Sequence, residues 1–134
     1  MEAEPKLTKI AEDKRGASWS ILLPDGQEII LIRTNAGYWR GGHSHNVREV
    51  SVLLSGSALY LTVNSEQIGS RVIEPFIQQA GEVLCNPPGK VHAALALDDY
   101  WLVDMRPGSK AADIKSTNDR DLRRLIEQQR EAPP

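Results

Sequence analysis

The stretch GYWRGGHSHNVREVSVLLSG, residues 37–56, contains two of the three histidines of the chain, His43 and His45, and Glu49 follows four positions later. Apolar and polar residues alternate through its second half, which is typical of a β-strand. In an extended chain, alternate side chains point to the same face, so these three would share one face. His45 and Glu49 would then lie about 13 Å apart. A site that uses both therefore needs a bend or a bulge, for which Gly41-Gly42 gives the backbone freedom.

The composition indicates one soluble domain. A chain of 134 residues fits a single domain and can bury a core without cross-links. The formal net charge is −2 and no basic stripe is present, so we expect no nucleic-acid partner. The single cysteine, Cys85, excludes an intrachain disulfide and favours a reducing compartment. With no apolar signal segment and no run of about 18 apolar residues, the sequence predicts a cytoplasmic protein without membrane contact.

Short segments that alternate apolar and polar residues, separated by turn residues, predict an all-β fold. Asp25-Gly26, Ser55-Gly56 and Asp98-Asp99 are tight-turn signals between such segments. Many short strands without a long helix between them are typical of a β-barrel or sandwich. Pro75 favours an edge or bulged strand for its segment. The predicted strands are residues 18–24, 27–33, 48–54, 57–64, 71–79, 82–85, 91–97 and 100–105.

The ends of the chain differ from its middle. Residues 1–16 are polar and predict a flexible N-terminal arm, residues 17–107 form the predicted barrel, and residues 108–134 form a tail. Ser116 or Thr117 would begin a short C-terminal helix. Its apolar stripe would pack on the barrel or on a partner subunit. That stripe consists of Leu122, Leu125 and Ile126.

The third histidine, His92, begins a predicted strand after a turn rich in proline and glycine. Ala94 and Ala96 share its face of the strand. Both are small, so they leave room for a substrate beside the histidine.

Two spacing patterns resemble the paired motifs of the cupin superfamily. The first is glycine, five residues, His-x-His, three residues, glutamate, six residues, glycine. The second is glycine, five residues, Pro-x-Gly, two residues, histidine. Ala96 stands where the family usually has an asparagine, which is not a metal ligand. The matching residues are Gly37, His43, His45, Glu49, Gly56, Gly81, Pro87, Gly89 and His92.

The resemblance implies a double-stranded β-helix (jelly-roll) barrel and one divalent metal ion inside it, held by His43, His45, Glu49 and His92. Three imidazoles and one carboxylate suit Fe, Mn, Co, Ni or Zn. Four protein ligands leave two positions of a six-coordinate ion open for substrate, water or O₂. The metal is therefore expected to be functional, because closed structural sites usually contain thiolates.

Three functions agree with this reading. The first is a metal-dependent enzyme acting on a small organic molecule, as a dioxygenase or as an isomerase or lyase, with Glu49 or Tyr60 moving a proton. The second is a non-catalytic cupin that binds a small molecule or a metal. The third is a structural barrel that serves as a dimer scaffold. We also expect a homodimer, formed through exposed strand edges in the 18–33 hairpin.

Residues that could contact the substrate are Tyr38, Trp39, Arg33 and Trp101. The first two precede the histidine strand and either line the pocket mouth or pack at the rim. Arg33 is the candidate for binding an anion, and Trp101 either faces the pocket or fills the core. We expect Cys85 to be a small buried hydrophobe, with a redox or substrate contact as the alternative.

Overall fold

The protein is described here from a computed structural model, in residues 6–45, 47–64, 72–105 and 117–118. Within these residues every regular element is a strand, which confirms the all-β prediction, and no helix is long and apolar enough to cross a membrane. The strands are β1 (Lys6–Asp13), β2 (Gly16–Leu22), β3 (Glu28–Thr34), β4 (Trp39–Ser44), β5 (Glu49–Ser55), β6 (Ser57–Asn64), β7 (Val72–Gln79), β8 (Val83–Asn86), β9 (His92–Ala96), β10 (Tyr100–Met105) and β11 (Thr117–Asn118).

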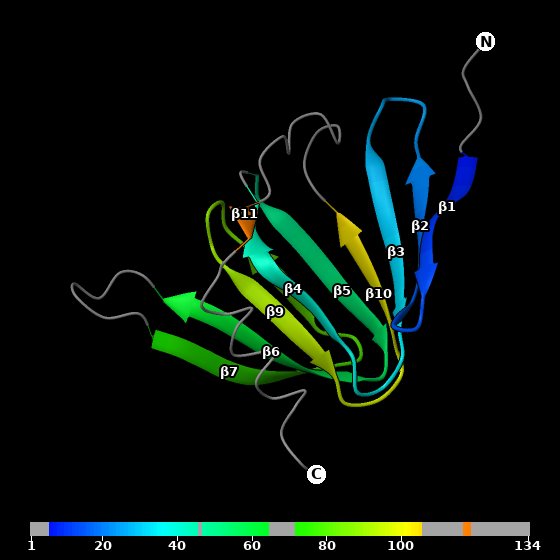
Figure 1. The fold of residues 1–134 in the computed structure, drawn as a ribbon. Coiled ribbons are helices and arrows are strands. Elements are labelled where there is room, and N and C mark those ends of the chain that lie inside the picture. Colours follow the sequence, from blue (N-terminus) through cyan, green and yellow to red (C-terminus); the bar gives the residue numbers. More distant parts are fainter. Residues whose placement is uncertain (1–5, 46, 65–71, 106–116, 119–134) are drawn as a thin grey trace.

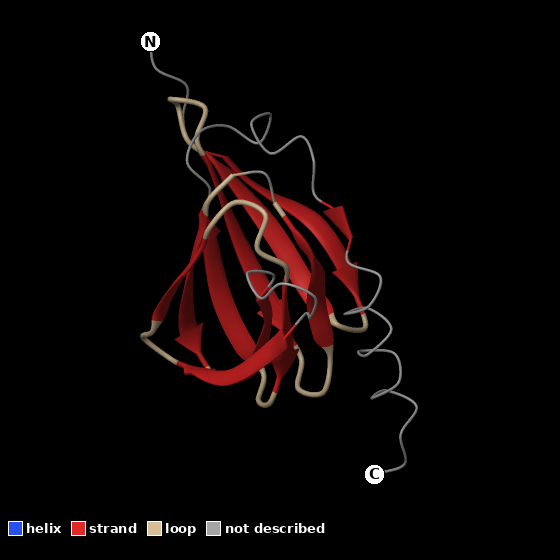
Figure 2. Ribbon diagram, turned by 90° about the vertical axis from the view of Figure 1, so that its left-hand side faces the viewer, coloured by secondary structure: helices blue, strands red, loops and turns tan. Residues whose placement is uncertain are grey.

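Two antiparallel sheets face each other and enclose the interior (Figures 1 and 2). The larger sheet has the order β1-β2-β3-β10-β5-β8, and the smaller sheet has the order β11-β4-β9-β6-β7. From β3 to β10 the chain passes from one sheet to the other at every connection except that between β6 and β7. Strands that are distant in sequence thus become neighbours, and β4, β5 and β9 bring both motif regions to one interior.

The eight predicted strands are all present, and their ends are shifted by at most two residues. Asp25-Gly26, Gly56 and Asp98-Asp99 lie in the turns where the sequence placed them. β7 is an edge strand, as Pro75 predicted, because a proline nitrogen cannot donate to a further strand.

The prediction of a flexible arm is wrong for Lys6–Asp13. This segment forms β1, which pairs antiparallel with β2, although all eight of its residues are exposed. This strand is held by backbone hydrogen bonds to β2 and not by burial of its side chains. Its sequence therefore has no apolar periodicity from which a strand could be predicted. β1 is the edge of the larger sheet, while β2 and β3 are paired on both sides. The 18–33 hairpin therefore does not offer the exposed edge that we expected.

The C-terminal tail is described only at Thr117–Asn118, which pairs with His43 and Ser44 of β4. These two residues form a strand, and the other residues of the helix expected from Ser116 or Thr117 onward lie outside the described residues.

The main core lies between the two sheets. Leu53 and Tyr100 of the larger sheet pack there with Tyr60 and Ala96 of the smaller sheet, and all four are at most 4% exposed. A second apolar cluster lies on the opposite face of the smaller sheet and contains Trp39, Leu61, Val63 and Ala93. The alanines of β9 have short side chains, which leaves space in the interior beside His92.

Cys85 is exposed, so the prediction of a small buried hydrophobe is wrong. Along β8 the side chains alternate, and Leu84 and Asn86 point inward toward the core and toward Glu49. The period of two then turns Cys85 and Val83 to the outside. The register of β8 could not be predicted from its residues, and the buried Asn86 shows which face of the strand points inward.

Candidate metal centre

The four predicted ligands come together from three strands and one loop. His43 is the penultimate residue of β4, His45 directly follows that strand, Glu49 begins β5 and His92 begins β9. Because β4 and β5 belong to different sheets, the chain turns between His45 and Glu49 instead of running straight. The turn removes the 13 Å separation of an extended chain, and His45 Nε2 lies 2.9 Å from Glu49 Oε2.

A β-bulge at two glycines aims His43 inward. Gly41 pairs with Ala93 while His43 pairs with His92, so β4 has one residue more than β9 in this interval. The φ angles of Gly41 and Gly42 are 90° and 81°, which side-chain-bearing residues rarely adopt. A Cβ at Gly41 would lie 2.8 Å from the carbonyl oxygen of His92. Both glycines are therefore needed where β4 passes close to β9.

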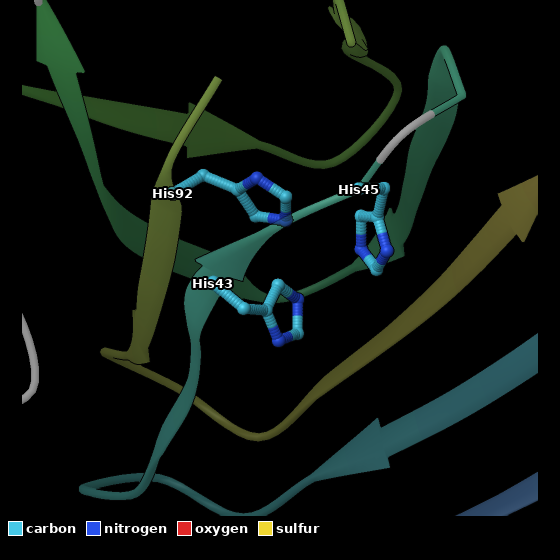
Figure 3. Close-up of side chains that lie close together, drawn as sticks. All are labelled: His43, His45 and His92. Carbon is cyan, nitrogen blue, oxygen red and sulfur yellow. The ribbon is translucent and has the colours of Figure 1, made fainter. Parts of the chain in front are cut away.

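The three imidazoles converge on one point (Figure 3). One ring nitrogen from each of His43, His45 and His92 lies within 4.8 Å of the others. Two nitrogens bonded to one ion at about 2.1 Å lie at most about 4.2 Å apart. Small side-chain adjustments thus bring this triad to coordinating distances, and the residues fit a divalent metal ion.

Glu49 completes the donor set. Its two carboxylate oxygens face two imidazoles, with His92 Nε2 at 3.3 Å from Oε1 and His45 at the other oxygen. His92 Nδ1 lies 3.1 Å from the carbonyl oxygen of Lys90, so a proton on Nδ1 would leave the Nε2 lone pair for the site. Lone pairs of imidazole and carboxylate repel unless a proton or a cation lies between them. This crowding of donors is what a metal ion would relieve.

The surroundings of Glu49 favour its charged form. Burial by itself would raise the pKa of this carboxyl, since only 5% of the residue is exposed. The hydrogen bond with His45 and the charges of His92 and His45 outweigh burial and lower the pKa, and a hydrogen bond with Asp104 acts in the same direction. Glu49 is therefore held as a carboxylate, the form that binds metals.

Asn86 links Glu49 to Tyr60, a role that the sequence analysis missed. Its Nδ2 donates to Glu49 Oε1 at 3.2 Å and to the Tyr60 hydroxyl at 2.6 Å. The Tyr60 ring stacks on His92, with centroids 5.9 Å apart and planes 5° apart. Burial raises the pKa of Tyr60 well above its usual range, despite the Asn86 hydrogen bond. The only sequence signal for Asn86 was a polar residue that ends an apolar strand before Pro87.

Asp104 is a second buried carboxyl that the sequence analysis missed. It lies on the inward face of β10, is 6% exposed and forms the hydrogen bond with Glu49 described above. A single acid inside the apolar segment YWLVDM was the available signal, because a buried acid is costly without a specific partner.

The metal centre opens into a cavity of about 720 Å³ between the sheets. The cavity is large enough for a small organic molecule. Of the predicted site residues, Tyr38 and Tyr60 line it with His43, Glu49 and His92. Trp39 borders it as well, although its side chain packs in the apolar cluster on the other face of the smaller sheet. The other lining residues are Asp13, Lys14, Arg15, Ile32, Gly37, Arg40, Gly41, Ser51, Ala94, Tyr100, Leu102 and Asp104.

Arg33 and Trp101 do not line the cavity, so the prediction that they contact a substrate there is wrong. They lie directly opposite each other on β3 and β10, and their neighbours Ile32 and Leu102 face inward. Strand alternation therefore turns Arg33 and Trp101 to the outer face. There Trp101 stacks on Trp19 at 5.5 Å, and the Arg33 guanidinium lies 5.8–5.9 Å from both ring centroids.

The sequence matches no family model, and no curated protein matches it either. Solved structures do resemble this one. CapF, the capsular polysaccharide assembling protein from Staphylococcus aureus, aligns with a TM-score of 0.68 and 19% identity over 85% of this chain and 32% of its own. A variant of oxalate decarboxylase from Bacillus subtilis aligns with a TM-score of 0.69 and 18% identity over 84% of this chain and 30% of its own.

The chain has the cupin fold. Both similar structures are cupin-fold proteins, and the sheets and the histidine cluster agree with the fold that the two sequence motifs implied. The chain spans about a third of the length of the solved chains that it resembles.

Proposed function

We propose that this cupin is a metal-dependent enzyme that acts on a small organic molecule in the cavity between its sheets. His43, His45, Glu49 and His92 would hold one divalent ion. One observation carries the proposal: three imidazoles converge beside a buried carboxylate, and His43, His92 and Glu49 of this group line a cavity of about 720 Å³. A closed structural site would not need such a space beside it.

Iron, manganese, nickel and zinc all suit the donor set. Manganese gains support from another solved structure of Bacillus subtilis oxalate decarboxylase, which is described by its Mn(II) centres and aligns at 19% identity with a TM-score of 0.68. Bound here, such an ion would polarise a carbonyl or carboxylate oxygen of the substrate as a Lewis acid.

The residues around the ligands favour proton transfer, and hence an isomerase or lyase. Tyr60 keeps its proton because burial raises its pKa. Its oxygen accepts a hydrogen bond from Asn86, so its own O–H can donate toward the cavity that it lines. Glu49 and Asp104 share a hydrogen bond and provide a second place for a proton. A dioxygenase would need the two open coordination positions but not these groups.

Two earlier expectations stay predictions. A homodimer would use the β1 edge, where Leu7 is 65% exposed and Ile10 is 47% exposed. A cytoplasmic location follows from the composition alone.

Metal titration of the metal-free protein by calorimetry tests the site. We expect about one equivalent of Mn²⁺ or Co²⁺ to bind, and we expect Glu49→Gln to weaken binding at least tenfold. Glu12→Gln is the matched control, because Glu12 is an exposed carboxylate of β1 whose salt bridge, within the described part of the chain, is with Lys9. Equal binding by wild type and Glu49→Gln would refute the site.

Turnover tests the catalytic part of the proposal. The metal-loaded protein is incubated with hydroxy acids, keto acids and sugars, and products are followed by NMR in D₂O. Incorporation of solvent deuterium that is lost in Tyr60→Phe would support proton transfer. Metal binding without turnover, together with a small molecule that copurifies, would favour the non-catalytic binding function.

A further inference from the structure

Arg40 places an unneutralised cation in the cavity wall. Its Nε donates to Thr34 Oγ1 at 3.1 Å and its Nη2 donates to the carbonyl oxygen of Arg33 at 3.1 Å. Both acceptors are neutral groups. Among the described residues, no carboxylate lies within ion-pair distance of this guanidinium, although Arg40 is partly buried and lines the cavity. Burial and the charge of Arg15 lower the pKa of Arg40 and outweigh Tyr100 and Asp13, which act in the opposite direction. An anion bound at the guanidinium would stabilise its charged form.

The β1–β2 turn adds a second cation at the same cavity. Asn35 holds the turn in place. Its Nδ2 donates to the carbonyl oxygen of Lys14 at 3.2 Å, and its backbone N–H donates to the carbonyl oxygen of Arg15 at 2.7 Å. Arg15 is already neutralised by Asp13, with Nη2 and Oδ2 2.8 Å apart. Lys14 has no such pairing in the described part of the chain and is exposed at the cavity.

The bulge at Gly41 and Gly42 places Arg40 and the metal ligands on one wall. In a regular strand Arg40 and His43 would face opposite sides, because they are three residues apart. The extra residue of the bulge brings both into the cavity lining. Arg40 pairs with Ala94 and His43 pairs with His92, so their positions are separated by two residues of β9, or about 7 Å.

We propose that Arg40, assisted by Lys14 at the rim, binds the carboxylate of a small organic acid whose other end reaches the metal centre. This inference rests on the proposed function for the metal end, and it names the substrate class as organic anions. The guanidinium is held by two hydrogen bonds and offers its remaining N–H groups to a carboxylate, which it can bind in a bidentate manner. Ala94, the small residue opposite Arg40, leaves room for the carbon chain of the acid.

The test compares malonate with its neutral isostere malonamide. Binding to the metal-free protein is followed by amide chemical shifts in NMR titrations, so that the metal plays no part. We expect malonate to bind and to shift the amides of β4 and of the β1–β2 turn, and we expect malonamide to bind at least tenfold more weakly. Arg40→Gln should weaken malonate binding about 10- to 100-fold, because a hydrogen bond to a charged group is lost.

Arg33→Gln is the matched control, because the Arg33 side chain lies on the outer face of the larger sheet and its loss should not affect malonate binding. Arg40→Lys keeps the charge and should retain part of the affinity, and thermal unfolding checks that each variant folds. Equal affinity of the wild type for malonate and malonamide would overturn the inference without any variant. Full affinity in Arg40→Gln would overturn it too.

The failure of this inference can be told apart from that of the proposed function. Titrating Mn²⁺ into wild type and Arg40→Gln measures the metal site alone, and both should bind it equally. If wild type bound no metal but bound malonate through Arg40, the proposed function would fail and the anion site would stand. If wild type and Arg40→Gln both bound Mn²⁺ and had the same affinity for malonate, only the anion site would fail.

Discussion

Replacing Gly41 by alanine tests whether the glycine bulge positions His43. At a φ of 90° a residue with a side chain costs about 1–2 kcal/mol. The new Cβ would also lie 2.8 Å from the carbonyl oxygen of His92 and 3.0 Å from the Cα of Ala93. Both neighbours are backbone atoms, so β4 and β9 have to separate, at a further cost of about 1–3 kcal/mol.

Gly26→Ala is the matched control for this change. Gly26 has a φ of 89°, but an added Cβ would meet no atom within 4 Å. The two variants thus share the backbone strain and differ in the close approach of two strands. The extra 1–3 kcal/mol of Gly41→Ala corresponds to a melting temperature about 4–12 °C below that of Gly26→Ala.

The assay has two readouts, both on protein prepared without metal. Thermal unfolding followed by circular dichroism gives the stability difference between the two variants. Titration with Mn²⁺ gives the second: Gly41→Ala should lose about tenfold or more in affinity, as changes that misorient a ligand do, and Gly26→Ala should lose none. Equal melting temperatures together with equal metal affinities would refute the role given to the bulge.

Three further predictions follow from side chains outside the ligand set. Asn86→Ala leaves Glu49 and the Tyr60 hydroxyl without their shared donor, so urea unfolding of the metal-free protein should show a loss of about 1–3 kcal/mol; an unchanged midpoint would contradict the link. The hydrogen bonds from Arg15 lower the pKa of Asp13 from 3.8 to about 2. The stabilisation of the folded protein by this pair is therefore present above pH 3.8 and is lost as the pH falls toward 2. An NMR titration of the Asp13 carboxyl should find its midpoint near pH 2, and Arg15→Gln should raise that midpoint. Exposed Cys85 should react with a thiol reagent in the folded protein nearly as fast as in urea, and a protected thiol would show that its face is covered.

Much of the site was predictable because its spacing is local. The residues of the two motifs, from His43 to Glu49 and from Gly81 to His92, implied the ligands by resemblance, and the structure brings the three histidines together. Asn86 and Asp104 were not predictable in the same way. Each is an isolated polar residue in an apolar strand, and its partner Glu49 lies on another strand.

The sequence by itself determined the all-β class, the central strands and the candidate ligands, because alternation, turn residues and motif spacing are properties of neighbouring residues. The tertiary structure alone decided which face each strand buries. Register turned Arg33, Trp101 and Cys85 outward, and a bulge of one residue turned His43 to the same side as Arg40. A shift of one residue reverses every side chain of a strand, and pairing with distant strands sets that shift.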